Sequence, residues 1–295
     1  MNDINISNIP EELLYKFQMP PVNHKTLKIW KYIIQENKKK IIKWYNELLY
    51  NHYIECGDLL LNIIIDESTH IKYWDLSKIN ILNIYITDNY MLSNFLFDSL
   101  VNINIINNLV IRNNKIKSLP ESFGNIKVGH NLDMPFNSLT SLPKSFGNIK
   151  IGNYLCLYNN KIKSLPANFG NIKVGGYINL AKNKLRKLPY SFGFINVRTD
   201  LVLSNNKLKI LPDSFGNLKV GRNLILWNNK LTKLPNNFGN IIIGKDLFLN
   251  NNQLANLPPS FNNLKYVNTI FLDNTLLTDI NLQNIKDIKI NYKHI

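Results

Sequence analysis

The chain has 295 residues, of which 45% are hydrophobic and 19% charged, a balance that fits a folded globular protein and excludes a disordered one. Two cysteines, Cys56 and Cys156, are too few for a disulfide framework, and no uninterrupted apolar stretch of 18 residues is present to span a membrane. The formal net charge of +15 favours acidic partners and carries no information about the fold.

Residues 1–58 differ in pattern from the rest and are predicted to form a helical N-terminal cap. Pro10 precedes Glu11 and Glu12, an arrangement typical of a helix start, with proline in the first turn and acids near its positive end. Apolar residues then recur at helical spacing, and Gly57 is expected to end the segment. These apolar positions are Leu27, Trp30, Ile34, Ile41, Tyr45 and Leu48.

Residues 59–108 are predicted to hold irregular or degenerate repeats. Ile84, Ile86 and Asn89 occupy the strand and turn positions of an irregular unit of 25 residues. Residues 59–83 are apolar, and their pattern does not decide between helix and strand.

A 23-residue period begins at Leu109, and seven near-regular units fill residues 109–269. A unit reads L-x-L-x-x-N-x-L-x-x-L-P-x-x-F-G-N-I-K-V-G-x-x and is too small to bury a core alone. At these positions the chain resembles the intracellular type of the leucine-rich-repeat family. The resemblance implies an α/β solenoid with a parallel sheet on its concave face, used as a binding scaffold. The repeat starts are Leu109, Leu132, Leu155, Ile178, Leu201, Leu224, Leu247 and Ile270.

The chemistry of the unit predicts the same solenoid. Alternation sends Leu155 and Leu157 inward and Cys156 and Tyr158 outward, so each unit offers one short strand to a parallel stack, with the right-handed sense of parallel crossovers. The asparagine at position six, here Asn160, can satisfy backbone groups in the bend after the strand. Proline at position twelve forbids a long helix on the return path, and phenylalanine at position fifteen fills its back. We therefore expect loops or short 3-10 turns there.

A glycine six residues after the phenylalanine replaces the leucine that many members of the family carry. Its place just before a strand indicates a close backbone approach or a positive φ angle. These glycines are Gly129, Gly152, Gly175, Gly221 and Gly244.

Residues 270–295 are predicted to be a degenerate C-terminal capping repeat, because open solenoid ends need a polar outer face. Leu272 and Leu277 keep the pattern, whereas Thr275 replaces the asparagine. The tail has near-helical apolar spacing, at Leu282, Ile285, Ile288 and Ile290.

The second position of the unit faces outward, and in the last four units it is apolar. A strand spacing of about 4.8 Å makes these side chains contiguous, with Trp227 beside them and polar Ser204 and Asn250 at the rim. Such a patch is typical of a protein-binding hot spot, although the same side chains can also stabilise one another as cross-strand pairs. The predicted binding residues are Val202, Ile225, Trp227, Phe248 and Phe271, joined by Tyr158 and Phe136.

Position seven carries lysine in most units, which predicts a basic ridge beside the sheet. The ridge can attract acidic proteins or polyanions, but lysine on an exposed turn is also ordinary solvation in a chain rich in Asn, Lys and Ile. No nucleic-acid-binding motif accompanies the charge, so a nucleic-acid partner is not the preferred prediction. The ridge consists of Lys115, Lys161, Lys184, Lys207 and Lys230.

Two alternatives stand beside the protein-interaction scaffold: a polyanion binder that uses the basic ridge, and an F-box-like adaptor. The run Ile9-Pro10-Glu11-Glu12-Leu13 resembles the opening of the F-box motif, which would recruit ubiquitin-ligase machinery. The later tryptophan of that motif has no match, since Trp30 and Trp44 stand at other distances from the proline.

Neither catalysis nor a cofactor or metal is predicted. The chain has no glycine-rich phosphate-binding motif, and its histidines lack metal-ligand spacing. Cys56-Gly57-Asp58 matches the C-x-D of bacterial ubiquitin ligases with leucine-rich repeats, but the chain has no room for their catalytic domain. A buried structural cysteine is the favoured interpretation. The histidines are His24, His52, His70, His130 and His294.

The opening Met1-Asn2-Asp3-Ile4-Asn5 lacks the basic and apolar regions of a signal peptide, so an intracellular protein is expected. The residue bias and the run F-G-N-I-K-V-G resemble uncharacterised repeat proteins of giant amoeba-infecting viruses and of AT-rich protists. That resemblance implies the host cytoplasm if the chain is viral. A monomer that binds a protein partner, and no membrane, is predicted.

Overall fold

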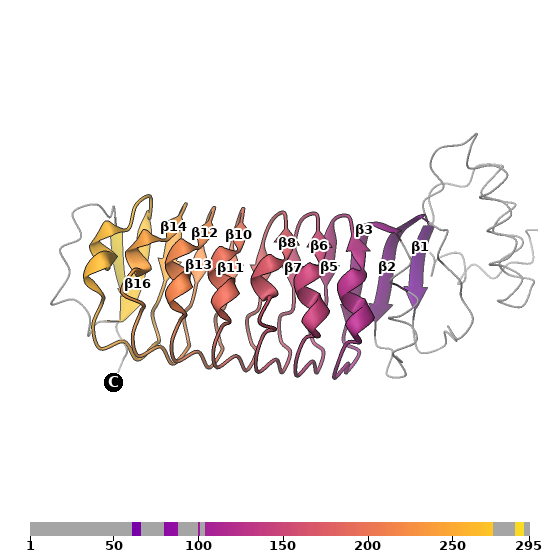
Figure 1. The fold of residues 1–295 in the computed structure, drawn as a ribbon, viewed down its shortest axis with the longest axis horizontal. Helices are drawn as coiled ribbons and strands as arrows, with labels where there is room; N and C mark the ends of the chain where they lie inside the picture. The colour runs from indigo at the N-terminus through magenta and orange to yellow at the C-terminus, as the bar shows by residue number, and fades with distance from the viewer. Residues whose placement is uncertain (1–60, 66–79, 88–99, 101–103, 274–286, 292–295) are drawn as a thin grey trace, which may run out of the picture.

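The computed structural model describes residues 61–65, 80–87, 100, 104–273 and 287–291. The predicted helical cap over residues 1–58, its F-box-like opening and the turn residue Asn89 lie outside this part of the chain. Successive coils stack side by side in chain order along the long axis of the molecule (Figure 1). The described part contains no helix that is long and apolar enough to cross a membrane.

One strand from each coil joins a parallel sheet that extends along the whole stack. Its order is β1 (Leu61–Ile65), β2 (Asn80–Thr87), β3 (Asn104–Arg112), β5 (Asn131–Asp133), β7 (Leu155–Cys156), β9 (Ile178–Asn179), β11 (Leu201–Val202), β13 (Leu224–Ile225), β15 (Asp246–Phe248), β16 (Thr269–Asp273) and β17 (Asp287–Asn291). From β3 to β16 each repeat start lies opposite the next, as Leu132 lies opposite Leu155. The predicted period of 23 residues is confirmed. The right hand of the coil and the concave shape of this face stay predictions.

Strands at both ends of the sheet depart from the sequence-based expectations. β1 pairs with β2 with Ile63 opposite Ile84, which places a coil in the segment whose pattern was ambiguous. β2 confirms the strand expected at Ile84 and Ile86, both fully buried. The near-helical interpretation of the C-terminal tail is wrong at β17, because Ile288 pairs with Ile270 of β16 in a parallel strand. Neither pairing has the 23-residue separation of the regular coils, so a search for that period misses both.

The return path of each regular coil is a short 3-10 turn, as expected from the proline, and in all but the last coil a two-residue strand follows. The backbone N–H of each phenylalanine donates to the carbonyl of the proline three residues earlier. The turns lie side by side along one flank of the stack (Figure 1). They are η2 (Glu121–Asn125), η3 (Lys144–Asn148), η4 (Phe169–Asn171), η5 (Tyr190–Phe194), η6 (Asp213–Asn217), η7 (Phe238–Asn240) and η8 (Pro259–Asn263). The return strands are β4 (Lys127–Val128), β6 (Lys150–Ile151), β8 (Lys173–Val174), β10 (Asn196–Val197), β12 (Lys219–Val220) and β14 (Ile242–Ile243).

The phenylalanines of the 3-10 turns form a continuous buried column at the back of the core. Neighbouring rings are stacked, with centroids 5.9–6.2 Å apart and planes within 3–12° of parallel. Each ring therefore packs mainly against the same residue of the coils before and after it, as expected for a solenoid. The column consists of Phe123, Phe146, Phe169, Phe192, Phe215, Phe238 and Phe261.

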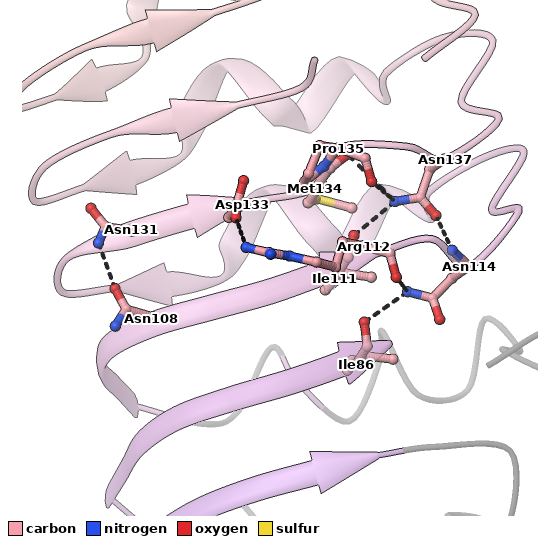
Figure 2. A network of polar contacts seen from close by, with 10 residues as sticks. All are labelled: Ile86, Asn108, Ile111, Arg112, Asn114, Asn131, Asp133, Met134, Pro135 and Asn137. Carbon is pink, nitrogen blue, oxygen red and sulfur yellow. Dashed lines mark hydrogen bonds and ion pairs between the residues drawn. The ribbon is translucent and has the colours of Figure 1, made fainter. Parts of the chain in front are cut away.

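The asparagines at position six form a second buried column, which confirms their predicted role. In Figure 2 the amide of Asn137 donates to the carbonyl of Ile111 at 2.7 Å, and its oxygen accepts the N–H of Asn114 at 3.1 Å. Each asparagine thus fastens its own bend to the preceding coil through backbone groups that have no strand partner. Asn114 reaches Ile86 of β2 in the same way at 2.8 Å, so the pattern extends to the irregular coil.

The glycines before the strands are present because the coils approach closely there. A β-carbon at Gly152 would lie 1.7 Å from the carbonyl oxygen of Gly129, and the other four glycines are as tight. None of them has a positive φ angle, so the close-approach interpretation is the correct one. In one coil this position is occupied by Arg198 instead of glycine. At that coil, within the described residues, no backbone hydrogen bond joins β8 to β10. The return strands consequently divide into two groups, β4-β6-β8 and β10-β12-β14.

Candidate functional site

The strand face is the outer surface of the sheet, formed by side chains that alternate with the buried leucines. In its C-terminal half an apolar strip follows four adjacent strands. Register places Val202 opposite Ile225, Ile225 opposite Phe248, and Phe248 opposite Phe271. All four side chains are partly exposed. The predicted strip is therefore contiguous, and its role in binding stays a prediction.

Two aromatic features shape the apolar strip. The rings of Phe248 and Phe271 stack with centroids 4.3 Å apart and planes 8° from parallel, so part of their surface is used for cross-strand packing. Trp227, just after β13, is partly exposed beside the strip. Asn250 is partly exposed at the rim, but Ser204 is buried and does not form the polar rim that was expected.

Phe136 and Tyr158 form a separate aromatic pair where the strand face meets the following turn. Their rings meet edge to face at 5.5 Å, and Lys182 places its Nζ 5.3 Å from the centre of the Tyr158 ring. Phe136 is 50% exposed. Phe136 and Lys182 hold the left-handed backbone position, with φ of 54° and 51°, that asparagine holds in the five other regular coils. This conformation is unfavourable for such residues by about 1–2 kcal/mol, and both exceptions contact the same tyrosine.

The N-terminal half of the strand face is polar and aromatic, unlike the apolar strip. Arg112 donates to the buried carboxylate of Asp133 at 2.6 Å in an ion pair (Figure 2). The rings of Tyr154 and Tyr177 lie 5.3 Å apart on neighbouring coils. Cys156 lies among these groups on the side of the sheet that the alternation predicts, but it is buried. Its side chain interacts with Asp133 and Tyr177 of the neighbouring coils.

Burial, with a smaller contribution from nearby Asp133, raises the pKa of the Cys156 thiol to about 12, although a backbone hydrogen bond from Tyr158 opposes the shift. Burial likewise raises the pKa of Tyr177 to about 12. The thiol therefore stays protonated at neutral pH and is not a nucleophile.

Alkylation of Cys156 by iodoacetamide at pH 8.5 is expected to be on the order of 1,000-fold slower in the folded protein than in urea, because the raised pKa leaves little thiolate. A Cys56→Ser variant isolates the signal of Cys156, and the rate should rise only at pH values near its raised pKa. Equal rates for the folded and unfolded chains would show that the thiol is exposed.

The lysines of the basic ridge are all exposed on the turns that follow the strand face. The backbone N–H groups of Lys184, Lys207 and Lys230 each donate to the preceding coil, which fixes the spacing of the ridge. Ser138 interrupts the column between Lys115 and Lys161. Within the described residues, no group of three or more His, Cys, Asp or Glu side chains could hold a metal ion.

Comparison with known proteins bears on the fold. No family model and no curated protein matches this chain. A leucine-rich-repeat protein of Leptospira interrogans aligns over 72% of this chain and 62% of its own, with TM-score 0.54 and 23% identity. A chain of the Toll–Spatzle complex of Drosophila aligns over 72% of this chain and 28% of its own, with TM-score 0.50 and 23% identity.

The leucine-rich effector protein YopM of Yersinia pestis is more distant, with TM-score 0.43 and 21% identity over 71% of this chain and 56% of its own. This chain thus spans less than two thirds of the length of each of the three proteins. The repeat register, the buried asparagine and phenylalanine columns and the likeness to the first two structures agree, and the chain has the leucine-rich-repeat solenoid fold.

Proposed function

We propose that this chain is a non-enzymatic scaffold that binds a protein partner on the strand face, through the apolar strip and Trp227. The observation that carries the proposal is the register of Val202, Ile225, Phe248 and Phe271, which puts four partly exposed apolar side chains on adjacent strands. Isolated exposed apolar groups are common, but contiguous ones mark interaction sites. The Toll–Spatzle complex is a solved example of this fold in an assembly of two proteins.

The charges beside the apolar strip suggest how a partner would be oriented. Asp200 and Asp246 are partly exposed at the start of their strands, and Lys207 and Lys230 of the basic ridge are exposed beyond the strand ends. Because Asp246 is paired with Lys245 at 3.8 Å, the charged border that a partner would meet is the positive one beyond the strand ends. A partner with an apolar centre and acidic groups toward the ridge would match this face, and the ridge would speed its association at low salt.

A double variant, Trp227→Ala with Phe248→Ala, is expected to stay folded and to bind the partner at least about 30-fold more weakly, because each removes an aromatic anchor. Capture by the immobilised full chain measures the effect. Tyr154→Ala with Tyr177→Ala is the matched control, since it truncates an aromatic pair on the other half of the same face. Equal capture by wild type and the Trp227 double variant, or a loss only in the control, would contradict the proposal.

The exposure of Trp227 can be tested without a partner. The other tryptophans are Trp30, Trp44 and Trp74, so the emission lost in a Trp227→Phe variant is that of Trp227 alone. We expect acrylamide to quench this difference signal in the free protein, because the indole is partly exposed. A difference signal that acrylamide does not reach would place Trp227 under other parts of the chain and remove it from the site.

A further inference from the structure

The return path presents a second regular surface, distinct from the strand face. From the end of each 3-10 turn through the return strand, outward side chains alternate with buried ones, as Asn171 and Lys173 alternate with Ile172 and Val174. We call the outward side of these segments the return face. In most coils its three outward positions are asparagine, lysine and glycine in that order. The lysines therefore form a row between a row of asparagine amides and a row of glycines.

Among the described residues, no ion pair neutralises a lysine of the return-face row. Lys127 lies directly opposite Lys150, and Lys150 opposite Lys173, on adjacent parallel strands, a placement of like charges that is unfavourable. Lys219 continues the row beyond the break. The ion pairs of the described part, Arg112–Asp133 and Lys245–Asp246, both lie elsewhere.

The excess positive charge of the whole chain is located in the solenoid. Residues 104–273 contain 22 lysines and arginines against 6 aspartates and glutamates, a net charge of +16, compared with +15 for the full sequence. Repulsion between the coils would be relieved by a linear anion that runs along the stack and contacts several lysines at once.

One coil in the middle of the row is altered at several outward positions. Phe194 stands where the other regular coils carry asparagine, and Arg198 stands where most carry glycine. Phe194 is 58% exposed and meets Tyr190, which is 65% exposed, edge to face at 5.8 Å. This is the coil at which β10 loses its pairing with β8. Two exposed rings therefore stand between the three lysines of β4, β6 and β8 and Lys219 of β12. The repeat would otherwise supply a small polar side chain at the position of Phe194.

We propose that the return face binds single-stranded nucleic acid, with phosphates along Lys127, Lys150, Lys173 and Lys219 and an unpaired base stacked on Phe194. Cation rows that track a phosphate backbone, combined with exposed aromatic rings, are the means by which single strands are held without sequence preference. A duplex offers its phosphates but not the faces of its bases. The asparagines beside the lysines present amides that can hydrogen-bond the edges of bases. A lipid surface offers no such edges.

The test uses the full chain and fluorescein-labelled 20-nucleotide single strands of mixed sequence, one DNA and one RNA, with anisotropy as the readout. Phe194→Asn restores the residue of the other coils without changing charge, and is expected to weaken binding about 10-fold through lost stacking. Phe136→Asn is the matched control. It replaces an exposed aromatic ring beside the strand face, away from the return face, by the asparagine that five other coils carry at that position. This variant should bind single strands as wild type does. Comparison of DNA with RNA shows whether the ribose hydroxyl contributes.

Two triple variants locate the phosphates. Lys127→Ser, Lys150→Ser and Lys173→Ser together should reduce the slope of log affinity against log salt by about 2, since three phosphate contacts are lost. Lys184→Ser, Lys207→Ser and Lys230→Ser remove the same charge from the basic ridge and should change the slope less. Circular dichroism and thermal unfolding confirm that each variant is folded.

Four results would overturn the proposal: no binding of single strands at 100 mM salt, equal binding of a matched duplex, a larger loss in the basic-ridge triple, or unchanged affinity in Phe194→Asn. Vesicles of phosphatidylcholine with phosphatidylserine form a further arm. If Phe194→Asn released the chain from such vesicles while single strands did not bind, the face would be a membrane surface instead.

Discussion

Replacing Phe192 by alanine is expected to lower the free energy of unfolding by about 3–5 kcal/mol, the largest single effect we expect in the solenoid. Phe192 is fully buried, and its ring stacks between Phe169 at 5.9 Å and Phe215 at 6.2 Å. Truncation opens a cavity in the middle of the column, and two neighbours lose a stacking partner together. Because each coil packs only on the coils beside it, the loss falls on both interfaces of one coil.

Urea unfolding followed by far-UV circular dichroism measures this change. Phe192→Leu keeps most of the volume and should cost clearly less than alanine, whereas Lys187→Ala, at an exposed position of the same coil, should stay within about 0.5 kcal/mol. If Phe192→Ala were as mild as Lys187→Ala, the column would not hold the coils together. A lower slope of the urea curve would show that the two halves of the solenoid unfold separately.

The repeat fold could be predicted because its rules are local and occur in seven coils. Alternation of leucines, a proline that stops a helix and a phenylalanine that needs burial each act within one unit, so one correct unit predicts the others. Asn160 could be placed inside the bend from its chemistry alone. In the structure its side-chain oxygen accepts the N–H of Leu139, and its amide nitrogen donates to the carbonyl of Met134, both at 3.0 Å. The strand face followed from the same alternation.

The end strands and the break in the return face could not be predicted in this way. β1 and β17 pair at separations that differ from the regular period, and pairing over a different loop length leaves no periodic signal. Arg198 is visible in the sequence as an exception to the glycine column. The loss of strand pairing at Arg198 could be found only from the structure. At the five glycines a β-carbon would lie 1.7–2.0 Å from a backbone oxygen of the preceding coil, so a side chain has no space there.

The candidate site was predicted in part. Alternation identifies which side chains face outward, but it does not say how far neighbours cover them. Cys156 and Ser204 face outward and are nevertheless buried. Phe136 lies after its strand, in a left-handed position, so its contact with Tyr158 of the next coil depends on a backbone angle that the sequence pattern does not give. In β16, near the C-terminal end of the sheet, Asp273 accepts the N–H groups of Asn251 and Asn252 at 2.7 and 2.9 Å, which no repeat rule indicated.

Replacing Asn206 by leucine is expected to lower the free energy of unfolding by at least about 1–3 kcal/mol, the cost of leaving one buried backbone N–H without a partner. The Asn206 oxygen accepts the N–H of Leu185 at 3.0 Å, and its amide nitrogen donates to the carbonyls of Leu180 and Leu203, both at 3.0 Å. Leucine has similar volume and makes none of these bonds, so the buried N–H of Leu185 bears the full cost of desolvation.

The matched control for Asn206→Leu is Lys207→Ser, the next residue in the chain, which is exposed and should cost less than about 0.5 kcal/mol. Amide hydrogen exchange adds a readout specific to the mechanism. In Asn206→Leu the N–H of Leu185 should lose protection more than that of Leu208, whose partner Asn229 is unchanged at 3.1 Å. Equal costs for the two substitutions, with Leu185 still protected, would show that water or a shifted backbone replaces the asparagine and that the column does not fasten one coil to the next.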